Sequence, residues 1–260
     1  MIIDFHTHVS IGEGREETVE GLDRTLALAH RANIDKIVLL GNVFRGGIRG
    51  NAEAVRAAND ETIRFVAHRP DQVYGFCYVN PLLDPGFLRE EISRCISEGG
   101  FRGIKLEADM NVRDGRMATV MEEALKHGVP ILQHAWYKTT AKEERESDPL
   151  DIADLAERYP ENIIIMAHLA ACGIRGVLDV ERFENVYVDT SGSQPFAGFV
   201  EYGVEKLGAD RIVFGSDITG RDFGCQLAKV TNADISNGDR EKILWKNALR
   251  LLKVDEATRE

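Results

Sequence analysis

Short apolar runs rich in β-branched residues alternate with longer amphipathic runs along almost the whole chain, and this alternation constrains the fold most. We expect strands near residues 2–6, 36–40, 74–79, 102–106, 129–134, 162–167, 186–190 and 211–215. We expect helices near residues 16–32, 50–68, 84–98, 115–127, 148–159, 173–184, 196–207 and 239–253. Such alternation is typical of parallel strands joined by crossover helices. Eight units in 260 residues predict a (β/α)8 TIM barrel, a single α/β domain over residues 1–260.

An open, doubly wound sheet is the alternative fold. No Gly-x-Gly-x-x-Gly turn follows the first apolar run, so a dinucleotide-binding version has little support. Boundary residues agree with the proposed helices: Gly128 follows one helical pattern, and Asp148 with Pro149 is typical of a helix start. Long connections follow the second and fifth strands, at 41–50 and 135–148, where barrels carry active-site loops.

Composition excludes some partners. The net charge of −11 argues against a nucleic-acid-binding surface, which needs a basic stripe. No apolar stretch approaches the length of a membrane span, and no signal-like segment precedes the first strand. The four cysteines are spaced like reduced thiols, not like a disulfide frame or zinc ribbon. These features predict a cytoplasmic enzyme that acts on a small molecule.

Side chains that bind metals stand at the ends of four predicted strands. Residues two apart share a face of a strand, so His6 and His8 point the same way. Three further strand-like runs end at His134, His168 and Asp217. In a barrel these ends converge on one mouth. Neutral imidazoles grouped in this way suit a metal ion.

Each of these residues also has a structural interpretation. Two adjacent histidines can be hydrogen-bonded or exposed to solvent, and a buried His134 or His168 can bond to the backbone. Asp217 can cap the segment that follows it. The remaining histidines lie within or after helical patterns, and we interpret them as surface or structural residues: His30, His68 and His127.

The ordered set of motifs resembles the amidohydrolase superfamily. It is most similar to the branch called amidohydrolase 2, which includes aminocarboxymuconate semialdehyde decarboxylase and related decarboxylases, hydratases and lactonases. The matching segments are Asp4-Phe5-His6-Thr7-His8, Ala58-Asn59-Asp60 through Tyr78-Val79-Asn80-Pro81, Gly103-Ile104-Lys105-Leu106, His134, Ala167-His168, Phe214-Gly215-Ser216-Asp217 and 243–252.

The resemblance implies a role for each matching residue. His6, His8, His134 and Asp217 would bind one divalent metal ion, with zinc favoured and manganese, iron or cobalt as alternatives. A metal-bound water would be the nucleophile, and Asp217 would accept and later deliver its proton. His168 would lie outside the ligand set and polarise the substrate. Asp4, one step deeper on the same face, would support the ligands by hydrogen bonding.

The fourth strand leaves two alternatives open. Lys105 and Glu107 share a face. Some superfamily members use a carboxylated lysine or a glutamate here to bridge two metals, so Glu107 could hold a second ion. We favour a single-metal site in which Lys105 is a structural or substrate-contacting residue, paired with Glu107 or Asp217.

Residues of the long loops are candidates for substrate binding. Arg45 and Arg49 could hold a carboxylate through paired hydrogen bonds, unless this glycine-rich loop is simply solvated. Trp136 could form a wall of the pocket or pack under its own loop. Lys105 could reach the substrate from the fourth strand.

From these observations we expect a metal-dependent hydrolase that cleaves an ester, lactone or amide bond of a small carboxylated substrate. The first alternative is a non-oxidative decarboxylase that uses the same residues, since one scaffold serves both chemistries. The second is a non-catalytic barrel that binds a ligand. Barrels of this kind often pair, so a homodimer is also expected, although no residue identifies an interface.

Overall fold

The computed structural model describes residues 1–9, 17–45, 49–138, 140–192 and 196–255. The strands are β1 (Ile3–Thr7), β2 (Lys36–Leu39), β3 (Val73–Tyr78), β4 (Gly103–Leu106), β5 (Ile131–Gln133), β6 (Ile164–Met166), β7 (Val186–Asp189) and β8 (Ile212–Val213). The α-helices are α1 (Val19–Arg31), α2 (Ala52–His68), α3 (Pro85–Ser97), α4 (Met117–His127), α5 (Pro149–Arg158), α6 (Leu169–Val180), α7 (Phe199–Leu207), α8 (Phe223–Thr231), α9 (Asn237–Glu241) and α10 (Asn247–Leu252).

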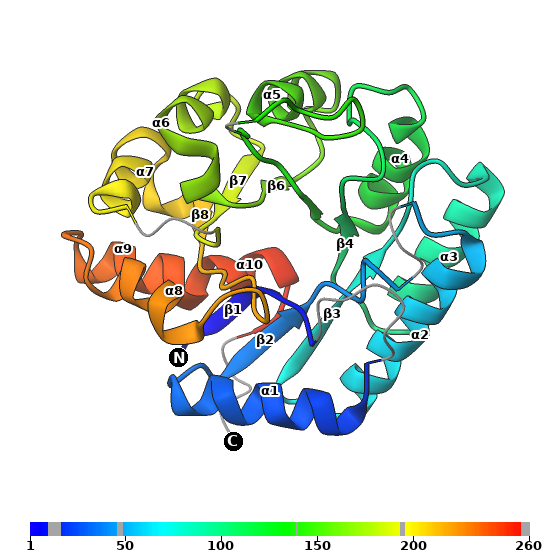
Figure 1. Cartoon of the computed structure of the whole chain (residues 1–260), viewed down its shortest axis with the longest axis horizontal. Helices are drawn as coiled ribbons and strands as arrows, with labels where there is room; N and C mark the ends of the chain where they lie inside the picture. Colours follow the sequence, from blue (N-terminus) through cyan, green and yellow to red (C-terminus); the bar gives the residue numbers. More distant parts are fainter. Residues whose placement is uncertain (10–16, 46–48, 139, 193–195, 256–260) are drawn as a thin grey trace.

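The strands form one parallel sheet in the order β1 to β8, and helices surround it (Figure 1). The backbone N–H of Phe5 donates to the carbonyl of Phe214 at 2.8 Å, and the N–H of Asp217 donates to the carbonyl of His6 at 2.8 Å. These bonds join β1 to the segment after β8. The predicted single-domain (β/α)8 TIM barrel is therefore confirmed.

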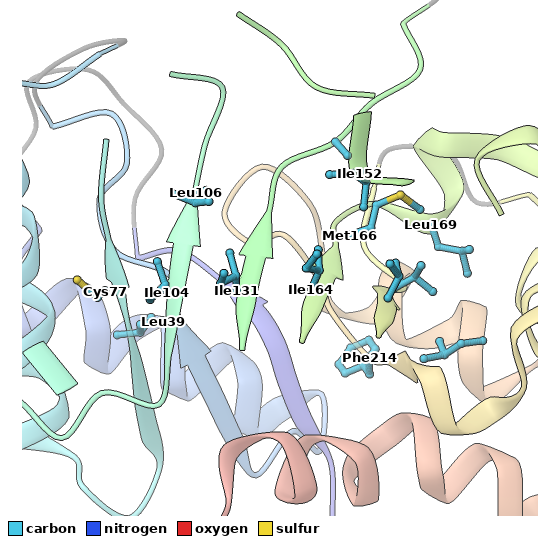
Figure 2. Close-up of a cluster of buried hydrophobic side chains, with 14 of the residues drawn as sticks. Leu39, Cys77, Ile104, Leu106, Ile131, Ile152, Ile164, Met166, Leu169 and Phe214 are labelled. Carbon is cyan, nitrogen blue, oxygen red and sulfur yellow. The ribbon is translucent and has the colours of Figure 1, made fainter. Parts of the chain in front are cut away.

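Alternate residues of each strand pack against the helices. Ile104, Ile131 and Ile164 on neighbouring strands lie in this layer (Figure 2), and Ile152 of α5 packs with them. Side chains of opposite parity form a second apolar cluster, which includes Leu132, Ile165, Val213 and residues of α10. Because residues two apart share a face, His134 lies on the face of Leu132. The apolar cluster thus supports the strand ends from which the polar residues project.

Local sequence signals set most helix boundaries. Asp148 and Asp151 form a reciprocal capping box at the start of α5, with Pro149 in the first turn, as predicted. Gly128 ends α4 with a φ of 64°, a left-handed conformation that favours glycine. In the described part of the chain, no helix combines the length and apolar character needed to cross a membrane.

The observed helices differ from the predicted ones at three places. We expected a helix over 173–184, but α6 begins at Leu169 and ends at Val180, with an interruption at Gly173 (φ 69°). The apolar stretch after His168 continues the pattern of β6, which hides the turn. Helix α8 was missed because Gly224 and its β-branched last residues lower helix propensity. The expected helix over 239–253 is divided into α9, a π-helix over Lys242–Lys246 and α10.

Candidate metal centre

Three predicted ligands converge at the mouth of the barrel. One ligand atom from each of His6, His8 and Asp217 lies within 4.8 Å of the others. Both histidines are buried, and Asp217 is 16% exposed. Asp217 adopts a φ of 60°, a left-handed turn after β8. The structure thus brings these three residues together, and two imidazole nitrogens with one carboxylate oxygen are donors that a divalent metal accepts. Their role as metal ligands stays a prediction.

Hydrogen bonds leave the Nε2 atom of each histidine available as a ligand. The Nδ1 atom of His8 donates to the carbonyl of Gly41 at 3.0 Å, and a carbonyl can only accept. The Nδ1 atom of His6 lies 2.8 Å from Oδ2 of Asp189, while its Nε2 lies 3.6 Å from Oδ1 of Asp217. Such bonds fix the tautomer of a metal-binding histidine and raise its basicity.

Asp189 is the residue that the sequence prediction missed. It ends β7 and is fully buried. Its Oδ1 accepts the backbone N–H groups of His168 and Ser191, at 3.1 and 2.9 Å, as well as the Ser191 hydroxyl. Asp189 could itself bind a metal with His6 and His168, but its bond to Nδ1 of His6 makes it a support for that ring. An acidic residue at the end of a predicted strand was the available signal.

His168 and His134 form a second group beside the first. His168 has a φ of 69°, which turns its side chain out of the β6 pattern. Its Nδ1 lies 2.8 Å from Oγ of Ser191, and its Nε2 lies 3.2 Å from Nδ1 of His134. The His168 ring centroid is 5.1 Å from that of His6. His134 therefore contacts His168 instead of joining the cluster of His6 and its partners, and its role as a fourth ligand stays a prediction.

Burial keeps most of these imidazoles neutral. It lowers the pKa of His8 to about 4 and that of His168 to about 3, and it also lowers the pKa of His134. Burial opposes ionisation of Asp217, but the neighbouring histidines, His6 first, outweigh it and lower the pKa of that carboxyl. At neutral pH the centre therefore offers a neutral His8 and an ionised Asp217, the protonation states that metal binding requires of these groups.

Lys105 and Glu107, at the end of β4, lie next to His134 of the second group. Lys105 is fully buried, and its Nζ lies 3.1 Å from Oε2 of Glu107. The other oxygen of Glu107, Oε1, lies 3.1 Å from Nδ1 of His134. Burial raises the pKa of Glu107, but His134 and Lys105 outweigh it and hold the pKa well below its usual range. This geometry favours the ion-pair alternative and leaves the second metal a prediction.

Asp4 supports the backbone, not a histidine ring. Its Oδ1 accepts the N–H groups of His6 at 3.1 Å and of Ser216 at 2.9 Å, which ties β1 to the segment after β8. Its Oδ2 is buried with no hydrogen-bond partner among the described residues. Burial raises the pKa of Asp4 to about 7.

A cavity of about 240 Å³ opens beside His134 and Glu107. Val43, Phe44 and Trp136 form its apolar wall. The Trp136 ring centroid is 6.3 Å from that of His134 and 6.2 Å from that of His168. A ring-shaped ligand that packs against Trp136 in this cavity would therefore also contact the histidines.

The two loop arginines are placed differently. Arg45 forms an ion pair with the buried carboxylate of Glu61. The backbone N–H of Arg49 donates to Oδ1 of Asp109 at 3.0 Å, and its Nε donates to the Asp109 carbonyl at 3.2 Å. Arg49 lines a neighbouring cavity and not the one beside His134. The substrate roles of both arginines stay predictions.

Comparison with known proteins identifies the family. The amidohydrolase family model matches residues 3–254. A γ-resorcylate decarboxylase from Polaromonas sp. is 25% identical over 302 residues, covering 94% of this chain and 90% of the relative. A structure of 2,6-dihydroxybenzoate decarboxylase with bound 2,6-dihydroxybenzoate has a TM-score of 0.78 at 20% identity, covering 97% of this chain and 98% of the other.

A third similar protein is a dihydroxybenzoic acid decarboxylase from Polaromonas sp., solved with manganese and the inhibitor 2-nitroresorcinol. Its TM-score is 0.76 at 20% identity, and the match covers 97% of this chain and 96% of the other. The expectation of a divalent metal is supported, whereas the preference for zinc is not confirmed. With residues 3–254 matched by the family model, the chain belongs to the amidohydrolase family and is an enzyme of that superfamily.

Proposed function

We propose that this protein is a manganese-dependent, non-oxidative decarboxylase of a small hydroxylated aromatic acid. The observation that carries the proposal is the cluster of His6, His8 and Asp217 at the mouth, close to a cavity walled by Phe44 and Trp136. A flat apolar wall beside a cationic centre suits an aromatic carboxylate. The relatives named above are decarboxylases, so this alternative has more support than the hydrolysis that we first expected.

The reaction needs a place for charge and a source of one proton. The bond between the ring carbon and the carboxylate breaks, carbon dioxide leaves, and the electron pair stays on the ring carbon until a proton arrives. A divalent ion held by His6, His8 and Asp217 would supply positive charge to the carboxylate and an adjacent ring hydroxyl.

Side chains of this protein would deliver the proton, contact the substrate and exclude water. Asp217, ionised in the resting site and partly exposed, would take up a proton from solvent and deliver it to the ring carbon. Neutral His168 donates from Nδ1 to Ser191, whose hydroxyl donates to Asp189, so its Nε2 would accept a hydrogen bond from a hydroxyl of the substrate. Phe44 and Trp136 hold the ring and exclude water.

Product analysis with 2,6-dihydroxybenzoate tests the proposal. The manganese-loaded protein should release carbon dioxide and resorcinol in equal amounts. Asp217→Asn should lower the turnover number by at least about a hundredfold, the scale of a lost acid–base group. Asp210→Asn, an exposed aspartate paired with Lys242, is the matched control and should leave turnover unchanged.

Other outcomes would favour the alternatives. Hydrolysis of lactones or amides without carbon dioxide release from any aromatic acid would restore the hydrolase. Binding of the acid with no turnover, unchanged in Asp217→Asn, would favour the ligand-binding barrel. Cytoplasmic location and pairing of two copies remain predictions.

A further inference from the structure

A second, larger cavity adjoins the one beside His134. It measures about 650 Å³, and four arginines line it: Arg49, Arg113, Arg116 and Arg145. Two carboxylates, Asp114 and Glu144, also line it, so four positive and two negative charges give a formal charge of +2. A cationic cavity of this kind is notable in a chain with a net charge of −11. It indicates a ligand group that is anionic.

The charge available to a ligand comes chiefly from Arg49, because the other three arginines are paired with carboxylates, Arg145 with Glu143 at 2.8 Å. Arg116 is paired with Asp114 at 2.7 Å, and Arg113 is paired with Asp151 at 2.8 Å. By contrast, Nε of Arg49 donates to a carbonyl oxygen, which neutralises no charge. Its exposed guanidinium can therefore still take a carboxylate or a phosphate through paired hydrogen bonds.

Arg145 connects this cavity with the one beside His134. It lines both cavities, and its side chain is only 17% exposed. Its Nη1 donates to the carbonyl of Ala108 at 2.6 Å, and its Nε donates to Glu143 at 2.8 Å. These two bonds hold the guanidinium at the junction between the cavities. His134, Trp136 and Arg145 line the same cavity, so a molecule that extends from it into the larger one can contact Arg145.

We propose that the arginine-lined cavity is a second binding compartment, which takes a carboxylate or phosphate at the far end of the substrate. This inference rests on the proposed function, because the near end of the substrate is then the carboxylate that is lost. The substrate class becomes an aromatic acid with a second anionic group on a short chain, larger than the dihydroxybenzoates that the relatives are named for.

Binding, not turnover, tests the compartment. The probe is 2-nitroresorcinol carrying a carboxypropyl chain para to the nitro group, compared with its terminal amide and with the unsubstituted compound. Titration calorimetry on the manganese-loaded protein at low salt should show the acid binding about tenfold more tightly than the amide, as expected for one charge-assisted hydrogen-bond pair. No preference for the acid would overturn the proposal.

Variants locate the effect. Arg49→Gln keeps the backbone bond to Asp109, and either it or Arg145→Gln should reduce the preference for the acid to within about twofold. Arg145→Lys, which keeps the charge, controls for folding and should retain part of the preference. Arg182→Gln is the matched control, an exposed arginine paired with Glu157, and it should leave the preference unchanged. A preference that survives in both glutamine variants would overturn the proposal.

A free anion, such as inorganic phosphate, is the other ligand that the arginine-lined cavity could bind. If inorganic phosphate tightens the binding of unsubstituted 2-nitroresorcinol and Arg145→Gln abolishes this effect, the compartment holds a separate anion and the assignment to the substrate is wrong. Failure of the proposed function looks different. Then 2,6-dihydroxybenzoate releases no carbon dioxide, whatever the preference between acid and amide.

Discussion

Replacing Asp189 by Asn should weaken metal binding without removing a predicted ligand. Asp189 accepts from Nδ1 of His6 at 2.8 Å on one oxygen and from two backbone N–H groups on the other. The single side-chain oxygen of asparagine can accept either from His6 or from the two backbone N–H groups, but not from both. If its NH₂ group faces His6, the imidazole proton must move to Nε2, the atom that faces Asp217. If the amide is flipped, NH₂ meets two N–H donors instead.

The magnitude follows from the lost bond. A hydrogen bond to a charged group contributes about 1.5–3 kcal/mol, and about 1.4 kcal/mol corresponds to a tenfold change in affinity. We therefore expect Asp189→Asn to weaken manganese binding by about 10- to 100-fold, in line with other carboxylates that support a metal-bound histidine. The substitution also removes the interaction of this carboxylate with the buried His6 ring, so the free energy of unfolding should fall as well.

The assay is a manganese titration of the chelator-treated variant, followed by calorimetry. Asp210→Asn, which removes an exposed charge, should bind like the unaltered protein. Circular dichroism and urea unfolding test whether the Asp189→Asn variant is folded under the conditions used. Manganese affinity within twofold of the unaltered protein would refute the reasoning that Asp189 orients His6.

Three further predictions concern packing and buried charge. Gly215→Ala should destabilise the protein by about 1–3 kcal/mol in urea unfolding, because the new Cβ would lie 2.9 Å from Cβ of His6. The pKa of Asp4 is raised to about 7, so its ionisation costs stability as the pH rises from the unfolded value towards 7. Between pH 5 and 7 in chelator, Asp4→Asn should therefore gain about 2.3 kcal/mol relative to the unaltered protein, and a pH-independent difference would count against this. Lys105→Met should destabilise by about 3–5 kcal/mol, since the largely buried carboxylate of Glu107 loses its charged partner and keeps the contact with His134, and a second change, Glu107→Leu, should recover most of the loss in urea unfolding.

The fold was predictable because its signal is repeated. Eight apolar runs lie close to the eight observed strands, and errors at their ends did not change the topology. The missed helix α8 and the shifted start of α6 follow turns at Asp217 and His168, both with positive φ. Sequence patterns report periodicity, and a single left-handed residue changes direction without changing the pattern.

The site was predictable to the extent that its residues end strands. His6, His8 and Asp217 were identified because the ends of barrel strands converge. Asp189 also ends a strand, but the pattern does not show that its carboxylate bonds to His6, a residue 183 positions away, so its supporting role was missed. The arginine-lined cavity was also not predictable, since Arg49, Arg113 and Arg145 come from separate loops.

The most direct test of the central claim is a titration of metal-free protein with manganese during turnover of 2,6-dihydroxybenzoate. We predict no carbon dioxide release without metal and a linear rise that ends at about one equivalent per chain, as a single site held by His6, His8 and Asp217 requires. Full activity in the presence of chelator, or none at saturating manganese, would contradict the account of this protein as a metal-dependent decarboxylase.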